Sequence, residues 1–178
     1  MTLADLKPGF ADAVFEAQAG FRVLLDAMAY AGRITTVDLN LDPPAPLDVA
    51  TAAIALTLFD FDTPVWLEPA VAAGPIAGWI RFHCGSAVIA ATGEAQFAVV
   101  CDAATMPALT GFSIGEDRYP DRSATLVVQV PSLTGGPATH WTGPGIDGTI
   151  EVAVAGLPND FWAQWDDNHA LYPLGVDV

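Results

Sequence analysis

Four segments of the chain predict helices, and in the first of them apolar residues recur at helical spacing. In the first segment, from Asp12 to Ala31, this period is followed by Gly32, which stands where a helix would stop. The residues that carry the period are Val14, Phe21, Leu25 and Met28. The other predicted helices are DVATAAIALTLFD from Asp48, the short PIAGWIRFHCG ending at Gly85, and a segment from about Asn159 to Ala170.

Short β-branched or alternating apolar runs lie between these segments and predict strands. The predicted strands are RITTVDL, TPVWLE, AQFAVVCD, TLVVQV and TIEVAV, with GVDV beginning a last one, while AVIAAT fits either a strand or a helix. NLDPPAP predicts a loop, GEDRYPDRSA an exposed charged loop, MPALTGF a short helix or turn, and SLTGGPATHWTGPGIDG turns around a short strand. This order predicts one α/β layer fold with a mixed sheet flanked by helices.

Composition and charge narrow the functional classes. The 178 residues fit one domain, and 52% of them are apolar while only 15% are charged. Six basic residues against 21 acidic ones give a net charge near −15, which disfavours binding to nucleic acid or to an anionic membrane. We expect a cytoplasmic protein. Its low charge indicates either an apolar surface that partners cover or a bias toward alanine.

Two carboxylates stand in an apolar stretch, LTLFDFDTPVWL, and allow three interpretations. Asp60 and Asp62 could be a catalytic pair, part of a metal site, or the polar edge of a turn. Pro64 holds Thr63 extended, and the pair falls between a predicted helix and a predicted strand. We therefore favour a turn in which Asp62 and Thr63 accept hydrogen bonds from backbone amides, without a metal.

The segment IRFHCG supplies the next candidates. Arg81 and His83 could bind a phosphate or a carboxylate, or could simply be cations favoured at the C-terminal end of a helix. His83 and Cys84 are adjacent, which makes them poor joint metal ligands, and no other cluster has zinc-like spacing. The glycine-rich segments TGPGIDG and TGG lack the phosphate-binding motifs, and Lys7 is the sole lysine. The residues alone therefore reveal no enzyme.

Seven segments together resemble one family. GFRVLLDAMAYAG, TLFDFDTPVWL, IRFHCG, AQFAV, ATLVVQVPSLTGG, TGPGI and YPLGVDV occur in the same order in the H subunit of the carbon–phosphorus lyase core complex, the PhnH family. The resemblance runs from about Phe10 to Val178. One departure is Ala31-Gly32, where the family usually has Pro-Gly.

The resemblance implies a fold and an assembly. It implies a single domain over residues 1–178, with residues 1–9 as an N-terminal arm. It also implies a three-layer sandwich similar to pyridoxal-phosphate-dependent transferases but without a working cofactor site, so no cofactor is expected. The expected partners are a second copy and the G, I and J subunits, in an assembly that joins a phosphonate to the ribose C1 of a nucleoside triphosphate.

Two hypotheses follow for the role of the chain in that assembly. The first is a non-catalytic interaction subunit, with no catalytic residue of its own. The second is a ligand-binding or catalytic subunit that holds nucleotide or phosphonate near Arg81, His83, Asp62 and Thr63.

Overall fold

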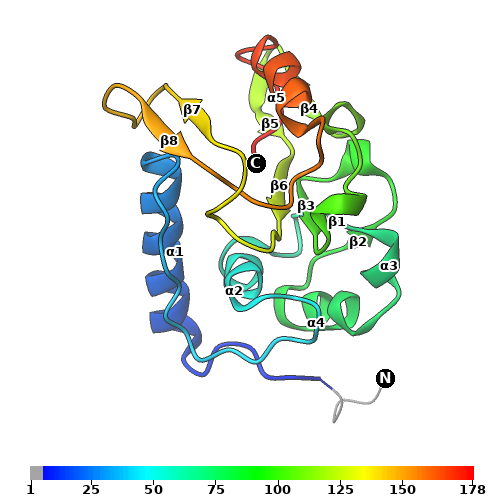
Figure 1. Ribbon diagram of the computed structural model, residues 1–178. Coiled ribbons are helices and arrows are strands. Elements are labelled where there is room, and N and C mark those ends of the chain that lie inside the picture. Colours follow the sequence, from blue (N-terminus) through cyan, green and yellow to red (C-terminus); the bar gives the residue numbers. More distant parts are fainter. Residues whose placement is uncertain (1–5) are drawn as a thin grey trace.

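The computed structural model describes residues 6–178 and alternates helices with short strands (Figure 1). The first half contains α1 (Ala13–Ala29), α2 (Val49–Leu58), β1 (Val65–Leu67), α3 (Pro69–Ala72), α4 (Pro75–Cys84), β2 (Val88–Ile89) and β3 (Phe97–Val100). The second half contains β4 (Ile114–Glu116), β5 (Tyr119–Ser123), β6 (Thr125–Val128), β7 (Thr139–Trp141), β8 (Ile150–Val152) and α5 (Phe161–His169). Short 3₁₀ turns lie at Thr92–Glu94 (η2), Ala103–Thr105 (η3) and Leu109–Gly111 (η4).

The central sheet is parallel throughout. Its strands lie in the order β2-β1-β3-β6, and Val65 of β1 pairs with Val88 on one side and Phe97 on the other. Beyond β6 the C-terminal segment begins a further parallel strand, because Asp177 bridges Thr125. The antiparallel pairs β4–β5 and β7–β8 form separate hairpins. The prediction of an α/β fold is therefore confirmed, but its parallel and antiparallel strands do not share one mixed sheet.

The alternation of side chains along the strands divides the core into two layers. Val65 and Leu67 of β1 face a cluster built with α2 and α4, and this cluster includes Trp79 and Ile80. Trp66, between them, faces the opposite cluster, which contains Phe161 of α5 and residues of η4. Both faces of the sheet are thus covered, as parallel sheets require.

The ends of the helices follow from local chemistry. The Asp12 carboxylate caps α1 by accepting from the amides of Val14 and Phe15. Pro75 starts α4, where its missing N–H costs nothing, and Gly85 ends α4 in the left-handed conformation with φ 73°. The sequence predicted α2, α4 and α5 near their observed positions.

Helix α1 lies at one side of the molecule, beside α2 and below the β7–β8 hairpin (Figure 1). Its predicted helical period is confirmed, but the apolar positions that carry the period face solvent. Val14 is 76% exposed and Met28 is 69% exposed. The one residue of α1 that is fully buried is Gly20, which approaches Thr57 of α2. The helix therefore approaches α2 closely at Gly20 and leaves Val14, Phe15, Phe21, Leu25 and Met28 exposed.

Two segment predictions were wrong. RITTVDL is extended but joins no strand ladder, while Val37 and Leu39 pack against the core. GEDRYPDRSA is not a loop, because most of it forms the β4–β5 hairpin, where Arg122 stacks on Tyr119 at 4.2 Å. Among the described residues, no helix is long and apolar enough to cross a membrane.

Candidate functional site

The turn that carries the two aspartates is closed by side chains, as predicted. Thr63 Oγ1 accepts from the Asp60 amide at 2.6 Å and donates to the Asp60 carbonyl at 2.8 Å. The Asp60 carboxylate accepts from the Asp62 amide at 2.9 Å, and the Thr63 amide donates to the Asp60 carbonyl at 3.2 Å. These four bonds fix the chain just before Pro64 and β1.

The assignment of Asp62 as an acceptor was wrong. The acceptors are Asp60 and Thr63, whereas the exposed Asp62 carboxylate accepts no hydrogen bond from the described residues. Asp60 performs this role because its side chain reaches an amide two residues ahead, which is the geometry of an Asx turn.

Ser86 joins this turn to the end of α4, a role that sequence reasoning missed. Its buried hydroxyl donates to the Asp60 carbonyl at 2.8 Å and lies 3.4 Å from the Thr63 hydroxyl. Gly85 brings Ser86 into position, because it turns the chain immediately after the helix. The only signal in the sequence was a hydroxyl residue directly after the predicted stop of the helix.

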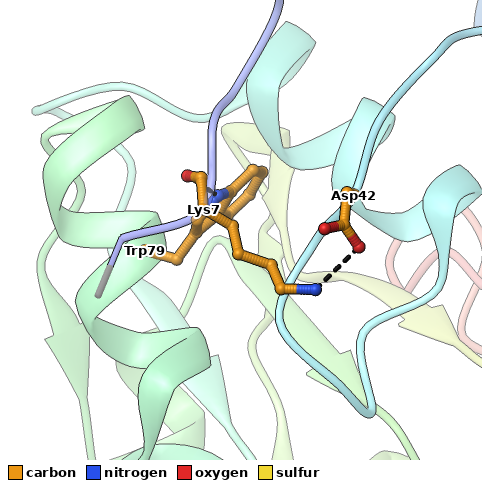
Figure 2. A network of polar contacts seen from close by, with 3 residues as sticks. All are labelled: Lys7, Asp42 and Trp79. Atoms are coloured by element: carbon orange, nitrogen blue, oxygen red, sulfur yellow. Dashed lines mark hydrogen bonds and ion pairs between the residues drawn. The ribbon is translucent and has the colours of Figure 1, made fainter. Parts of the chain in front are cut away.

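His83 holds the N-terminal arm rather than the turn. His83 Nε2 lies 3.0 Å from the Lys7 carbonyl, and since a carbonyl only accepts, this nitrogen carries the proton. Trp79 Nε1 donates to the same carbonyl at 3.0 Å. Figure 2 shows Lys7 beside Trp79, with its ammonium group reaching Asp42 at 2.7 Å. The His83 ring also lies against Gly9, so residues 7–9 of the expected arm cross over α4, whereas its residues 1–5 lie outside the described part of the chain.

Arg81 lies in other surroundings. Its side chain is exposed and lines an open hollow at the start of α4, together with Gly74, Pro75 and Gly78. Among the described residues no ion pair or hydrogen bond joins Arg81 or His83 to Asp62 or Thr63. The structure thus places Asp62 and Thr63 in one turn, with His83 at the arm and Arg81 at the hollow.

A buried carboxylate that sequence reasoning missed lies at the opposite end of β1 from this turn, just beyond the carboxyl end of the strand. Glu68 follows β1, and its carboxylate accepts from the amides of Cys101 and Asp102 at 3.1 and 3.4 Å and from the Thr105 hydroxyl at 3.3 Å. Ligands of parallel sheets often bind beyond the carboxyl ends of the strands. Here the acceptor capacity of Glu68 is used to hold the end of β3.

The two cysteines are poor nucleophiles. Burial raises the pKa of the Cys84 thiol to about 12. Burial, and then the negative charges of Glu68 and Asp48, raise the pKa of the Cys101 thiol to about 12. Both thiols are free and protonated near neutral pH. Within residues 6–178 no group of three or more His, Cys, Asp or Glu residues could hold a metal ion.

Comparison with known proteins decides the family. Residues 8–178 match the family described as Bacterial phosphonate metabolism protein (PhnH). The chain belongs to the PhnH family.

Two relatives are similar to the chain over most of its length. The alpha-D-ribose 1-methylphosphonate 5-triphosphate synthase subunit PhnH of Rhizobium meliloti (strain 1021) is 46% identical over 169 residues, which cover 95% of this chain and 84% of the relative. The putative C-P lyase subunit protein HtxG of Stutzerimonas stutzeri is 30% identical over 162 residues, covering 90% of this chain and 76% of the relative. The resemblance inferred from the seven sequence segments is therefore confirmed.

Proposed function

We propose that the protein is a non-catalytic interaction subunit of the carbon–phosphorus lyase core complex. In this role it supports the formation of ribose 1-phosphonate 5-triphosphate from ATP and an alkylphosphonate. The observation that carries the proposal is the apolar surface of α1, where Val14, Phe21, Leu25 and Met28 are all exposed. Apolar side chains gathered on one face of a monomer usually mark an interface.

The bonding of the candidate residues supports the same role. Thr63 and His83 are engaged in holding the turn and the arm, which are structural tasks. The net charge of −15 also disfavours an anionic ligand, because six basic residues must serve the whole surface.

The proposal extends to partners, location and fold. We expect a cytoplasmic homodimer that joins the G, I and J subunits and binds neither nucleic acid nor membrane. We further expect one domain over residues 1–178, with residues 1–9 as its arm. We also expect a three-layer fold similar to pyridoxal-phosphate-dependent transferases, with no cofactor and no metal.

Arg81 favours a second candidate function, the binding of a phosphate or phosphonate group. Arg81 is exposed at a hollow that it lines together with Gly74, Pro75 and Gly78, where the α4 helix begins. Calorimetry with ATP and with methylphosphonate separates the two functions. Binding that disappears in Arg81→Ala would favour the second function, and the absence of binding would favour the first.

Co-expression with the G, I and J subunits tests the main proposal. The chain should co-purify with them through gel filtration. A stable monomer that elutes apart from the other subunits would contradict the proposal.

A further inference from the structure

One side of α1 carries a straight line of exposed positions, which we call the α1 seam: Val14, Gln18, Phe21, Leu25 and Met28. Their spacing alternates between four and three residues, which is the spacing of the contact line in a coiled coil. The other side of the helix packs on α2. The seam is therefore suited to packing against a second helix.

The two ends of the seam have opposite shapes. At the N-terminal end Val14 and Phe15 protrude, and Phe15 is 71% exposed. Just past the C-terminal end lies an open hollow of about 440 Å³, whose lining includes Tyr30, Gly32 and Ile150. Sixteen residues separate Phe15 from Ala31 at this hollow, which is about 24 Å along a helix.

We propose that the α1 seam packs antiparallel against the α1 seam of a second copy, with Phe15 of each copy entering the hollow of the other. In this register Leu25 faces Phe21 of the partner subunit, and Gln18 faces the partner's Met28. The inference rests on the proposed function, because it assigns a surface to the homodimer proposed above.

Two observations favour a second copy over a different protein. A protrusion and a hollow at opposite ends of one seam complement each other under two-fold symmetry, which is the requirement of an isologous interface. The seam itself carries no acidic residue, whereas the whole chain has a net charge of −15. Two strongly acidic copies therefore meet with least repulsion along this seam.

Charge substitution tests the surface. Phe21→Glu with Leu25→Glu should raise the dimer dissociation constant by about a hundredfold or more, because two apolar contacts at the centre of the interface become repulsive. Light scattering should then report a monomer at micromolar concentration. Phe61→Glu is the matched control, because Phe61 is equally apolar and 76% exposed but lies in the turn after α2. It should remain dimeric, and circular dichroism should show all variants folded.

Cysteine cross-linking tests the orientation. Gln18→Cys and Met28→Cys should each fail to cross-link alone, since identical positions lie about 15 Å apart along an antiparallel pair. A mixture of the two variants should form a disulfide-linked dimer. The native Cys84 and Cys101 compete little, because their pKa values are about 12. Cross-linking of either single variant alone would instead show a parallel pair and overturn the orientation.

Co-purification with the G, I and J subunits separates failure of this inference from failure of the proposed function. A seam variant that is monomeric while the control stays dimeric supports the inference. A seam variant that stays dimeric but no longer joins the other subunits overturns it, because the seam would then bind them, and the interaction role would stand. Wild-type chain that dimerises but never joins the assembly would contradict the proposed function alone.

Discussion

Thr63→Val removes the hydroxyl that closes the turn before β1 while keeping the shape of the side chain. The variant loses the acceptor for the Asp60 amide and the donor to the Asp60 carbonyl. The carbonyl keeps its bond from Ser86, so the larger loss is at the amide, which is near solvent. At about 1 kcal/mol for each net hydrogen bond, we expect the free energy of unfolding to fall by about 1–2 kcal/mol.

Thermal unfolding measures this loss. For a chain of this length the melting temperature should fall by roughly 2–8 °C, and Asp60→Ala should lower it by a similar amount. All variants must be compared at one protomer concentration, because a dimer melts in a concentration-dependent way.

Asp62→Ala is the matched control for this turn. Its exposed carboxylate accepts no hydrogen bond from the described residues, so the variant should stay within about 0.5 kcal/mol of the wild type. If Asp62→Ala destabilised the protein as much as Thr63→Val, the assignment of the acceptors in this turn would be refuted.

Two further predictions concern packing and the thiols. Gly145 has φ +81°, and in Gly145→Ala the new Cβ would also collide with the Ala29 carbonyl oxygen, so the free energy of unfolding should fall by about 2 kcal/mol or more. Gly148 has a similar φ but open space around it, so Gly148→Ala should cost only about 1 kcal/mol. Cys84 and Cys101 should react slowly with a thiol reagent at pH 8 and quickly after unfolding, and rapid reaction of the folded protein would contradict their burial. Because folding raises both pKa values from 9.0 to about 12, the free energy of unfolding should fall as the pH rises through this range, which denaturant titration measures.

Much of the fold could be predicted from continuous apolar runs. The strands β1, β3 and β6 lie within such runs, because parallel strands are covered on both faces. The β4–β5 hairpin could not be predicted, since its exposed and charged side chains give no alternating pattern. The helical period predicted α1 but not the direction it faces, because burial depends on the contact between Gly20 and α2.

The candidate site could be predicted only where the residues that share a hydrogen bond lie close together in the sequence. The turn at Asp60 follows from the chemistry of Asp, Thr and Pro, although Asp60 and Asp62 could not be told apart. Glu68 was missed because the amides it binds belong to the end of β3, far along the chain. The bond from His83 to Lys7 likewise depends on tertiary folding.

Turnover of the reconstituted core complex tests the central claim most directly. The measurement is the rate of ribose 1-phosphonate 5-triphosphate formation per assembled complex, with this chain carrying Arg81→Ala, His83→Leu or Asp62→Ala. A non-catalytic interaction subunit predicts that each variant retains the wild-type rate once the amount of assembled complex is taken into account. A variant that folds, dimerises and assembles fully but leaves the complex inactive would contradict the account.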